Sequence, residues 1–443
     1  MASSPAPPSR PLPDSTGRPL STLERTWLVA DRVAPPFVNQ LVLEGEGWPV
    51  PAAGWPRLLL ELARAVPGCR LRLRGALGGC RWVADGPLPA VQEVDGSCWD
   101  GQGPAGAPWL RAPLSPEQGP TCELLLVRPG APPTAPASAR GAGSKPPVPR
   151  LVLRTHHAVT DGQGTLLLAR ALFALLRQEQ PEPATAGLPT DEGLATMAPL
   201  PAASWQPPPE QSVSPVGPAT PDLAAGLRWA RQSVPGRFSA LLPQVLLLLA
   251  RHAGAGPDRP VLVSVPVDLR PHRPGLHSTA NLTGFHHVPL HELVTAPDPR
   301  AAIQGALAAQ RAAGAELAHL RFLASQPGLR WTPLGVLAAG ASRLARQALA
   351  RDRFGASAAV SNLGRLDLTP LQGGGFVARR AFFIPPGNPA VPLFLTLTGG
   401  PAGLELCGTM PDSLAGEGRL TGLLAALAGG LQDPAAAAPL GRY

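Results

Sequence analysis

Two adjacent histidines, followed shortly by an aspartate and a glycine, have the clearest chemical potential in this sequence. His156, His157, Asp161 and Gly162 form the pattern HHxxxDG. Histidine is suited to proton transfer near neutral pH because its ordinary pKa lies close to that pH. One positioned imidazole can take a proton from an alcohol, amine or thiol while that group attacks a thioester carbonyl, and no covalent enzyme intermediate is needed.

The same residues also have structural interpretations. A single histidine is more often part of a protein's framework than of its chemistry. Asp161 precedes a predicted helix start, so it could serve only as the N-cap of that helix. A carboxylate at this distance could also fix the turn or bind a basic partner without touching a substrate. The presence of all these residues at one strand-to-helix junction favours a functional site.

The segment is predicted to lie on a turn between a strand and a helix. Residues 151–155 form an apolar run that should be a strand ending at His156. Gly162 and Gly164 then interrupt the pattern before a helical apolar spacing over residues 166–176. Loops at such junctions often position ligands in α/β proteins.

Helices and strands mix along the rest of the chain. Apolar residues at helical spacing predict helices over residues 55–66, 164–177, 237–252, 299–324 and 333–350. Short apolar runs predict strands over residues 40–43, 70–74, 122–127, 151–155, 261–267, 358–362, 381–384 and 393–398. Both halves contain helices and several strands, without a direct sequence repeat. The sequence therefore predicts two lobes of similar α/β design.

Proline-rich stretches suggest where the lobes begin and end. We expect a disordered tail over residues 1–17, an N-terminal lobe over 18–180, a proline-rich connector over 181–222 and a C-terminal lobe over 223–443. Residues 129–149 read as a long loop that joins two strands. The length of 443 residues is too great for one ordinary core and suits two lobes of roughly 200 residues each.

Composition and charge argue against several classes of protein. The formal net charge of +8 invites a nucleic-acid interpretation, but Lys145 is the only lysine and the arginines are scattered singly. We therefore expect no nucleic-acid partner.

The five cysteines include no CxxC pair, which argues against a disulfide framework or a zinc ribbon and favours a reducing, cytoplasmic location. The N-terminus lacks the apolar region of a signal peptide, and the longest apolar stretch, residues 245–250, is too short to be a transmembrane segment.

Three segments together resemble the chloramphenicol acetyltransferase-like superfamily. They are RTHHAVTDGQG (154–164), VPVDLRP (265–271) and AVSNLGRLD (359–367), and their order and spacing extend the resemblance over almost the whole chain past the tail. This superfamily contains nonribosomal peptide condensation domains and free-standing acyltransferases that use coenzyme A. The chain looks most similar to the condensation-related alcohol acyltransferases of the polyketide-associated type. The DFGWG segment of the plant branch is absent.

The resemblance implies a fold and an activity. The fold would be α/β, with two chloramphenicol acetyltransferase-like lobes arranged as a V and a tunnel between them. The activity would be transfer of an acyl group from a thioester of coenzyme A or of a carrier protein to an alcohol or amine, in secondary metabolite or lipid biosynthesis. The acyl-CoA or acyl-phosphopantetheine would be a substrate, and no metal or other cofactor is implied. The partners would be the thioester donor, a small-molecule acceptor and an acyl or peptidyl carrier protein. We expect the protein itself to be a monomer.

The resemblance also assigns roles to residues of the first segment. His157 matches the catalytic histidine, which acts as general base, and His156 matches its less critical neighbour. Asp161 matches a structural aspartate that forms a salt bridge with an arginine, for which Arg270 is the candidate; the alternative is that Arg270 lies on the surface after a core strand. Gly162 matches a glycine that leaves space at the floor of the channel.

Two asparagines could add to such a site. Asn362, in SNLG, matches a strand segment near the tunnel and could donate a hydrogen bond to an oxyanion, although an asparagine at a strand end more often forms a turn. Asn281, in STANLTGF, could also face the site.

Other candidate motifs are weaker. His287 and His291 have the spacing of zinc-binding helices, with His286 beside them, but Pro289 disfavours a helix there and no third, acidic ligand is evident, so we expect no metal site. Asp412-Ser413-Leu414 is similar to the attachment sequence of carrier proteins, but too little chain follows it, and we interpret Asp412 or Ser413 as a helix N-cap. There is no GxxxxGK[ST] loop and no GxSxG elbow.

Two other functions remain open from the residues alone. The chain could be a non-catalytic, condensation-like protein that binds or docks a partner, and an open or a plugged tunnel at His157 would separate this function from catalysis. It could also be a hydrolase of thioesters or esters, in which water takes the place of the acceptor at the same residues.

Overall fold

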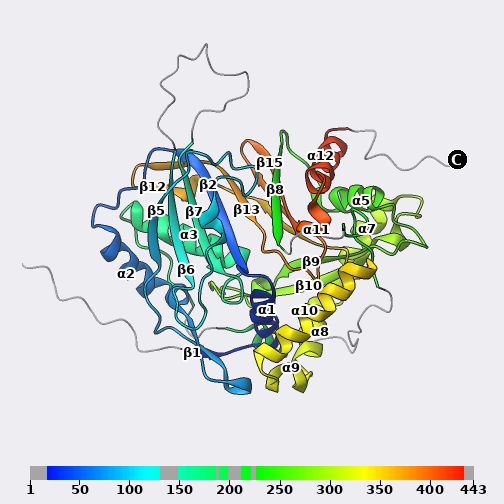
Figure 1. The fold of residues 1–443 in the computed structure, drawn as a ribbon. Helices are drawn as coiled ribbons and strands as arrows, with labels where there is room; N and C mark the ends of the chain where they lie inside the picture. Colours follow the sequence, from blue (N-terminus) through cyan, green and yellow to red (C-terminus); the bar gives the residue numbers. More distant parts are fainter. Residues whose placement is uncertain (1–16, 130–147, 186–188, 198–210, 221–225, 434–443) are drawn as a thin grey trace, which may run out of the picture.

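The two large sheets of the protein define two lobes (Figure 1). The computed structural model describes residues 17–129, 148–185, 189–197, 211–220 and 226–433. The first six-stranded sheet has, in spatial order, β12 (Gln372–Gly373), β13 (Phe376–Ile384), β2 (Val38–Glu46), β7 (Arg150–His156), β6 (Cys122–Arg128) and β5 (Ala90–Asp95). Its strands are antiparallel except for the β5–β6 pair.

The second six-stranded sheet combines parallel and antiparallel pairs. In spatial order it has β10 (Thr283–Pro289), β9 (Leu262–Asp268), β11 (Ala358–Arg365), β14 (Phe394–Gly400), β15 (Gly403–Pro411) and β8 (Leu227–Val234). The pairs β9–β11 and β11–β14 are parallel. A small sheet has the order β1 (Gly17–Pro19), β4 (Arg81–Val83) and β3 (Arg72–Arg74). The mixed α/β class expected from the sequence is confirmed.

Helices pack against both sheets (Figure 1). The α-helices in the described parts of the chain are α1 (Thr22–Val33), α2 (Trp55–Ala65), α3 (Gly162–Leu176), α4 (Asp191–Met197), α5 (Leu241–Ala253), α6 (Leu290–Leu293), α7 (Pro299–Ala312), α8 (Ala315–Ala324), α9 (Pro327–Trp331), α10 (Leu334–Arg351), α11 (Asp412–Ala415) and α12 (Arg419–Gln432). Helix α3 packs on β2 and β7, α12 packs on β8 and β15, and α1 packs against α8 and α10. None of the helices in these described ranges has the length and apolar character needed to cross a bilayer.

The central strands of the first sheet are buried on both faces. Leu41 and Leu43 of β2 pack in the core under α2 and α3, whereas Val42 packs in a second core on the opposite face. That second core also contains Trp229 and Cys407, which belong to the other sheet. Because successive residues of a strand point to opposite faces, a continuous apolar run such as that of β2 is expected where both faces are covered. The second core joins the two lobes.

A buried ion-pair network also joins the lobes. Arg231 of β8 donates from Nη2 to Glu44 of β2 over 3.1 Å and from Nε to Glu405 of β15 over 2.8 Å. Arg150 of β7 donates to Glu44 over 3.0 Å, and the Arg231 guanidinium lies 3.9 Å from the centre of the Phe382 ring. Burial alone would raise the pKa of Glu44, but the attraction of Arg231 and Arg150 outweighs it and lowers that pKa. The network therefore links strands of both sheets through charged groups.

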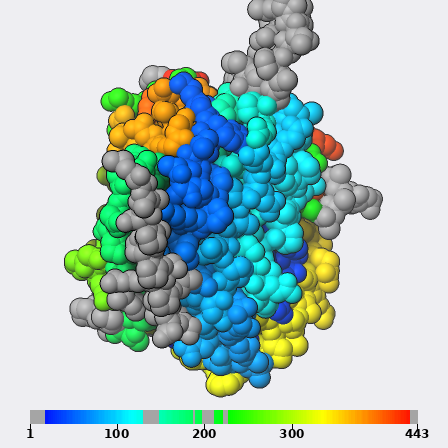
Figure 2. Space-filling view, turned by 90° about the vertical axis from the view of Figure 1, so that its left-hand side faces the viewer, coloured from blue at the N-terminus to red at the C-terminus, as the bar shows by residue number. Residues whose placement is uncertain are grey.

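The chain crosses between the lobes late in the sequence. Strands β12 and β13 follow β11 of the second sheet, yet β13 pairs with β2 from Val377↔Glu46 to Ile384↔Gln40, and the chain then returns to the second sheet at β14. In Figure 2, orange residues of this late segment lie against blue residues of the N-terminal part. The division expected at residues 222 and 223 did not anticipate this crossover.

Several predicted elements have different bounds in the structure. The single helix predicted over residues 299–324 is two helices, α7 and α8, because Gly314 adopts a left-handed conformation between them, with φ +61°. The helix predicted from residue 237 begins at Leu241, after Ala240 in a left-handed conformation. The strand predicted over 70–74 is β3 alone, preceded by the 3-10 turn Pro67–Arg70.

Some expectations concern residues whose structure is not described. Residues 1–16 of the expected tail lie outside the described ranges, and Gly17 begins β1. Residues 130–147 of the expected loop also lie outside, although β6 and β7 on either side of it form the antiparallel pair that such a loop would join. Of the expected connector, residues 186–188, 198–210 and 221–222 lie outside, while its described part contains α4, which the sequence analysis missed.

Candidate active site

The histidine pair lies on a tight turn between β7 and α3. Strand β7 ends at His156, and the backbone carbonyl of His156 accepts hydrogen bonds from Val159 N over 2.9 Å and Thr160 N over 3.1 Å. Helix α3 then begins at Gly162, with Asp161 as its N-cap. The strand, turn and helix fall where the sequence pattern predicted them, so the turn geometry is set locally.

His157 is almost completely buried, with 8% of its surface exposed. Its ring packs against Trp27 and Phe37, with ring centroids 5.4 Å and 5.2 Å away, and these two rings stack on each other at 5.6 Å. Its Nδ1 lies 3.3 Å from the Thr160 carbonyl oxygen, and no hydrogen bond joins its Nε2 to any described residue. A proton on Nδ1, donated to that carbonyl, would leave the lone pair of Nε2 available as a base.

Burial sets the protonation of His157. Loss of hydration outweighs the attraction of Asp161 and the Thr160 carbonyl, and it lowers the pKa of His157 to about 4. The imidazole is therefore neutral at neutral pH, which is the form that a general base needs.

The backbone around His157 is held by two asparagines. Asn281 Nδ2 donates to the His157 carbonyl over 2.6 Å, and Asn39 Nδ2 donates to the Thr160 carbonyl over 2.6 Å. Asn281 therefore supports the turn rather than facing the cavity, which had been considered from the sequence. Asn39 was missed; a buried asparagine within the apolar strand β2 was the signal that could have indicated it.

His156 points away from the cavity that His157 lines. It is fully buried, its Nδ1 accepts from Ala158 N over 3.2 Å, and its Nε2 lies 3.5 Å from Asp31 Oδ2 on α1. Burial would raise the pKa of Asp31, but the nearby His156 imidazole and the Phe37 N–H outweigh it and lower that pKa. His156 thus ties the turn to α1.

Asp161 is both an N-cap and an ion-pair partner. Its Oδ1 accepts from Gly164 N over 2.7 Å and from Arg270 Nη2 over 3.0 Å. Its Oδ2 accepts from Arg270 Nη1 over 3.1 Å and from Leu282 N over 2.8 Å. The two oxygens therefore fix the start of α3 and join it to the segment that contains Arg270 and Leu282.

Arg270 is buried and bonds to two backbone segments. Besides Asp161, it donates to the carbonyls of Ser278 and Ala280 over 2.9 and 2.8 Å and to Asp268 over 2.7 Å. Burial would lower the pKa of Arg270, but the charges of Asp161 and Asp268 outweigh it and raise that pKa. The alternative position for Arg270, on the surface, does not occur in the structure.

Gly162 lies at the cavity and Asn362 does not. A Cβ on Gly162 would approach Leu363 Cδ2 to 3.1 Å, at the wall of the cavity. Asn362 is exposed, and its Oδ1 accepts from Gly364 N over 3.1 Å, as in a turn. Its neighbours Ser361 and Leu363 line the cavity instead, because alternate residues of β11 point to opposite faces.

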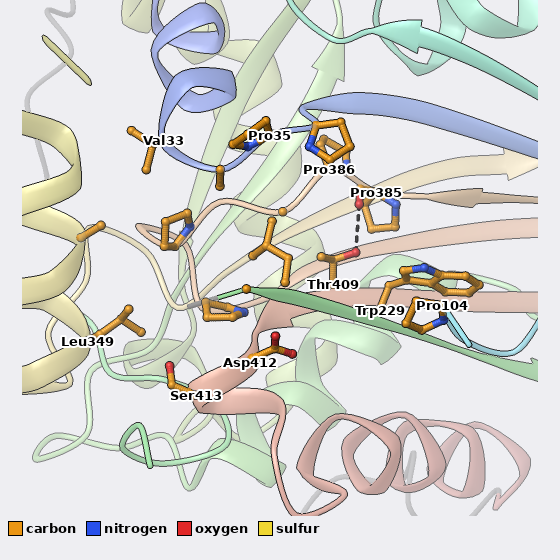
Figure 3. Close-up of a pocket in the computed structure, with 18 of the residues that line it drawn as sticks. Val33, Pro35, Pro104, Trp229, Leu349, Pro385, Pro386, Thr409, Asp412 and Ser413 are labelled. Atoms are coloured by element: carbon orange, nitrogen blue, oxygen red, sulfur yellow. Dashed lines mark hydrogen bonds between the residues drawn. The ribbon is translucent and has the colours of Figure 1, made fainter. Parts of the chain in front are cut away.

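Two cavities lie between the lobes. The first, which we call the His157 cavity, has a volume of about 320 Å³ and is lined by α1, the turn, α8 and one face of β9, β10, β11 and β14. The second, the interlobe cavity, has about 1070 Å³ and lies among the α1–β2 loop, α10 and the end of β15. Figure 3 shows its wall, where Thr409 Oγ1 donates to the Pro385 carbonyl over 2.9 Å. Ile384, Pro385 and Pro386 line both cavities, so the two are neighbours.

The other motifs considered from the sequence have a different geometry in the structure. His287 lies on β10 and His291 on the short helix α6, so they do not share a helix face, and no group of three His, Cys, Asp or Glu residues in the described chain is arranged to hold a metal ion. The interpretation of Asp412 or Ser413 as an N-cap was wrong by one residue: Pro411 holds that position, and Asp412 accepts from Arg228 Nε over 3.2 Å.

The fold is that of condensation domains. The starter condensation domain of rhizomide synthetase RzmA, solved as a double variant in complex with C8-CoA, matches with a TM-score of 0.59 at 15% identity, covering 96% of each chain. The first condensation domain of the CDA synthetase matches with a TM-score of 0.58 at 18% identity, covering 96% of this chain and 97% of that one. An RzmA structure with C8-CoA and Leu-SNAC also has a TM-score of 0.58, at 17% identity, covering 96% and 95%. No family model and no curated protein matches the sequence.

Proposed function

We propose that this protein is an acyltransferase that moves an acyl group from a thioester to an alcohol or amine, with His157 as general base. The observation that supports it most is the position of His157: a neutral imidazole in the wall of a cavity between two lobes, with Nδ1 held by a carbonyl. The condensation-domain fold, and the complexes of similar domains with C8-CoA, support the choice of a thioester donor. We further propose coenzyme A or a carrier protein as the donor, in secondary metabolite or lipid biosynthesis.

In this mechanism Nε2 of His157 accepts the proton of the acceptor as its oxygen or nitrogen attacks the thioester carbonyl. The new bond to the carbonyl carbon forms and the carbon–sulfur bond breaks. The proton then passes from the imidazolium to the departing thiolate, which restores neutral His157. Asp161 and Arg270 do not touch the reacting atoms in this proposal; they hold the turn that presents the ring.

The space beside His157 bears on the non-catalytic alternative. A protein that only docks a partner has no need of a cavity of about 320 Å³ in contact with a neutral, oriented imidazole. This open space favours catalysis over a docking function. Hydrolysis uses the same residues, so it differs only in whether water replaces the acceptor.

The test is a panel of acyl-CoA donors with alcohol and amine acceptors, read by release of free thiol. We expect His157→Ala to lower the rate by roughly two to four orders of magnitude, because a positioned base is removed. His252→Ala, which removes an exposed histidine from the end of α5, should keep full activity. Full activity in His157→Ala would rule out the mechanism, and thiol release that does not depend on any acceptor would indicate a hydrolase.

A further inference from the structure

Three polar side chains gather on one part of the wall of the His157 cavity. Ser264 lies on β9, His287 on β10 and His319 on α8, and all three line the cavity. The Ser264 Oγ is 3.1 Å from His287 Nδ1, and the two histidine rings have centroids 5.4 Å apart at an angle of 84°. We call these three residues the distal cluster.

The distal cluster lies far from the turn between β7 and α3 that carries His157, which we call the catalytic turn. Thr283 and His287 both line the cavity, and they are four residues apart on β10. Thr283 marks the end near the turn, because its Oγ1 lies 3.4 Å from Asp161 Oδ2. With the rise per residue of an antiparallel strand, His287 lies about 13 Å further along. The cavity therefore has one polar end at the turn and another at the distal cluster.

The wall between these two ends is aromatic. Phe285 lies between Thr283 and His287 on the same face of β10, and its ring centroid is 6.0 Å from Trp27 and 6.0 Å from His319. Trp27 in turn packs against His157. A substrate that reached from the turn to the distal cluster would run along apolar rings, which suits a hydrocarbon chain.

The distal cluster favours a neutral group of the substrate over a charged one. The residues that line the His157 cavity include no lysine or arginine, and its carboxylate, Asp161, is paired with Arg270. Burial, together with a neighbouring histidine, lowers the pKa of His287 and of His319 to about 4 each. Both rings are neutral at neutral pH, so they can donate to or accept from a hydroxyl, whereas a carboxylate would be buried without a cation.

The junction between the His157 cavity and the interlobe cavity indicates the direction from which a thioester donor would enter. Ile384, Pro385 and Pro386 line both cavities. Ile384 pairs with Gln40 of β2, two residues from Val38, which pairs with His156. In the first sheet, the junction therefore lies within a few residues of the turn that carries His157. In the second sheet it lies at β15, because Pro385 accepts from Thr409, and β15 is three strands away from β9 of the distal cluster. A thioester arm that came through the interlobe cavity would place its carbonyl at His157 and its acyl chain toward the distal cluster.

Building on the acyl transfer proposed above, we propose that the His157 cavity selects an acyl donor with a hydroxyl group on the order of ten bonds from the thioester carbonyl, and that the distal cluster binds this hydroxyl. The volume of about 320 Å³ is small for a ligand pocket and suits one chain of this kind.

The experiment compares two donors of equal length by equilibrium binding to the full-length protein. We expect ω-hydroxydecanoyl-CoA to bind about tenfold more tightly than decanoyl-CoA in isothermal titration calorimetry, because the hydroxyl gains partners in a buried site. The pair ω-hydroxyhexanoyl-CoA and hexanoyl-CoA is the control: its hydroxyl stops short of the distal cluster, so it should give no preference for the hydroxylated donor.

Substitutions in the distal cluster then test whether it causes the preference for the hydroxylated donor. His287→Leu and His319→Leu should each reduce the tenfold preference to less than about threefold, and the double variant should abolish it. His252→Leu, on α5 and outside the cavity, should leave it unchanged. If thermal melting shows that a leucine variant does not fold, Ser264→Ala, which removes only the hydroxyl oxygen, takes its place.

The outcomes separate this inference from the proposed function. Equal binding of the two decanoyl donors, a preference that survives in the double variant, or no binding of either donor would overturn hydroxyl recognition. Thiol release is measured with the same donors: turnover without a hydroxyl preference leaves acyl transfer standing and removes only this inference. Tighter binding of the hydroxylated donor without thiol release, for any acceptor, removes acyl transfer and retains the recognition site.

Discussion

At the scale of single residues, Asp161 shows how one side chain can have both roles that the sequence presented as alternatives. One carboxylate oxygen caps α3 through Gly164 N, and both oxygens accept from Arg270. A carboxylate has about four acceptor positions, so a cap and a bidentate ion pair do not compete. This pairing across 109 residues could be suggested from sequence only because a family resemblance drew attention to Arg270. The positions of Asn281 and Asn362 could not be inferred, since they depend on which face each backbone turns to the cavity.

The pH dependence belongs to the same scale. Because burial lowers the pKa of His157 to about 4, kcat/KM should stay constant as the pH falls from 8 to about 5 and then decline with a midpoint near 4. Stopped-time assays of thiol release across this range would measure the midpoint. A midpoint near 6.5 in folded protein would mean that the imidazole is hydrated.

Stability must be followed in the same experiment. The pKa values of His157, His287 and His319 are all near 4 in the folded protein, below the ordinary value of 6.5. The unfolded chain therefore binds more protons between these pH values, and folding loses up to about 1.4 kcal/mol per pH unit for each histidine as the pH falls from 6.5 to 4. Circular dichroism at each pH separates loss of the base from loss of the fold.

At the scale of elements, local pattern predicted the parts that make the turn but not the contacts between them. Strand β7 and helix α3 were evident because their apolar periodicities are strong. Helix α1, which supplies Trp27 and Asp31 to the site, was missed because charged residues interrupt its apolar spacing. Strand β10 was considered only as a possible metal motif, although its alternating burial is typical of a strand. Pairing partners are not visible in local sequence.

The close packing of helix α3 at Gly164 leads to a prediction about stability. Gly164 was expected to interrupt the pattern, but in the structure it allows α3 to approach the segment before β10: a Cβ there would lie 2.4 Å from the Thr279 carbonyl oxygen and 2.9 Å from Thr160 Cγ2. Gly164→Ala should therefore lower the free energy of unfolding by about 1–3 kcal/mol in urea titration, because backbone must shift to relieve the overlap. It should also weaken activity, since Asn281 follows Thr279 closely and holds His157.

The control is a glycine in another helix. A Cβ on Gly305 of α7 would meet no atom within 4 Å. Gly305→Ala should raise the free energy of unfolding by about 0.5–1 kcal/mol, through helix propensity alone. Equal effects of the two substitutions would show that the contact with Thr279 does not constrain α3.

At the scale of the whole molecule, the lobes are joined by an apolar core and by buried charge. Arg231→Met should lower the free energy of unfolding by about 3–5 kcal/mol, because Glu405 and Glu44 remain buried after losing a cation. Arg228→Met is the matched control on the same strand: its ion pair with Asp412 is exposed, and the change should be below about 1 kcal/mol. Denaturant titrations of both variants measure the difference, and similar losses would show that the buried network does not bind the lobes together.

The crossover of β13 has a consequence for how the chain is made. The first sheet needs β13 to cover β2, yet Phe376–Ile384 leaves the ribosome only after most of the second lobe. Until then β2, which pairs with β7 on one side, is an edge strand whose other side has backbone N–H and C=O groups that can pair with other chains. The two lobes are therefore one unit of cotranslational folding, and a chain that stopped near residue 222 would expose a strand edge prone to aggregation.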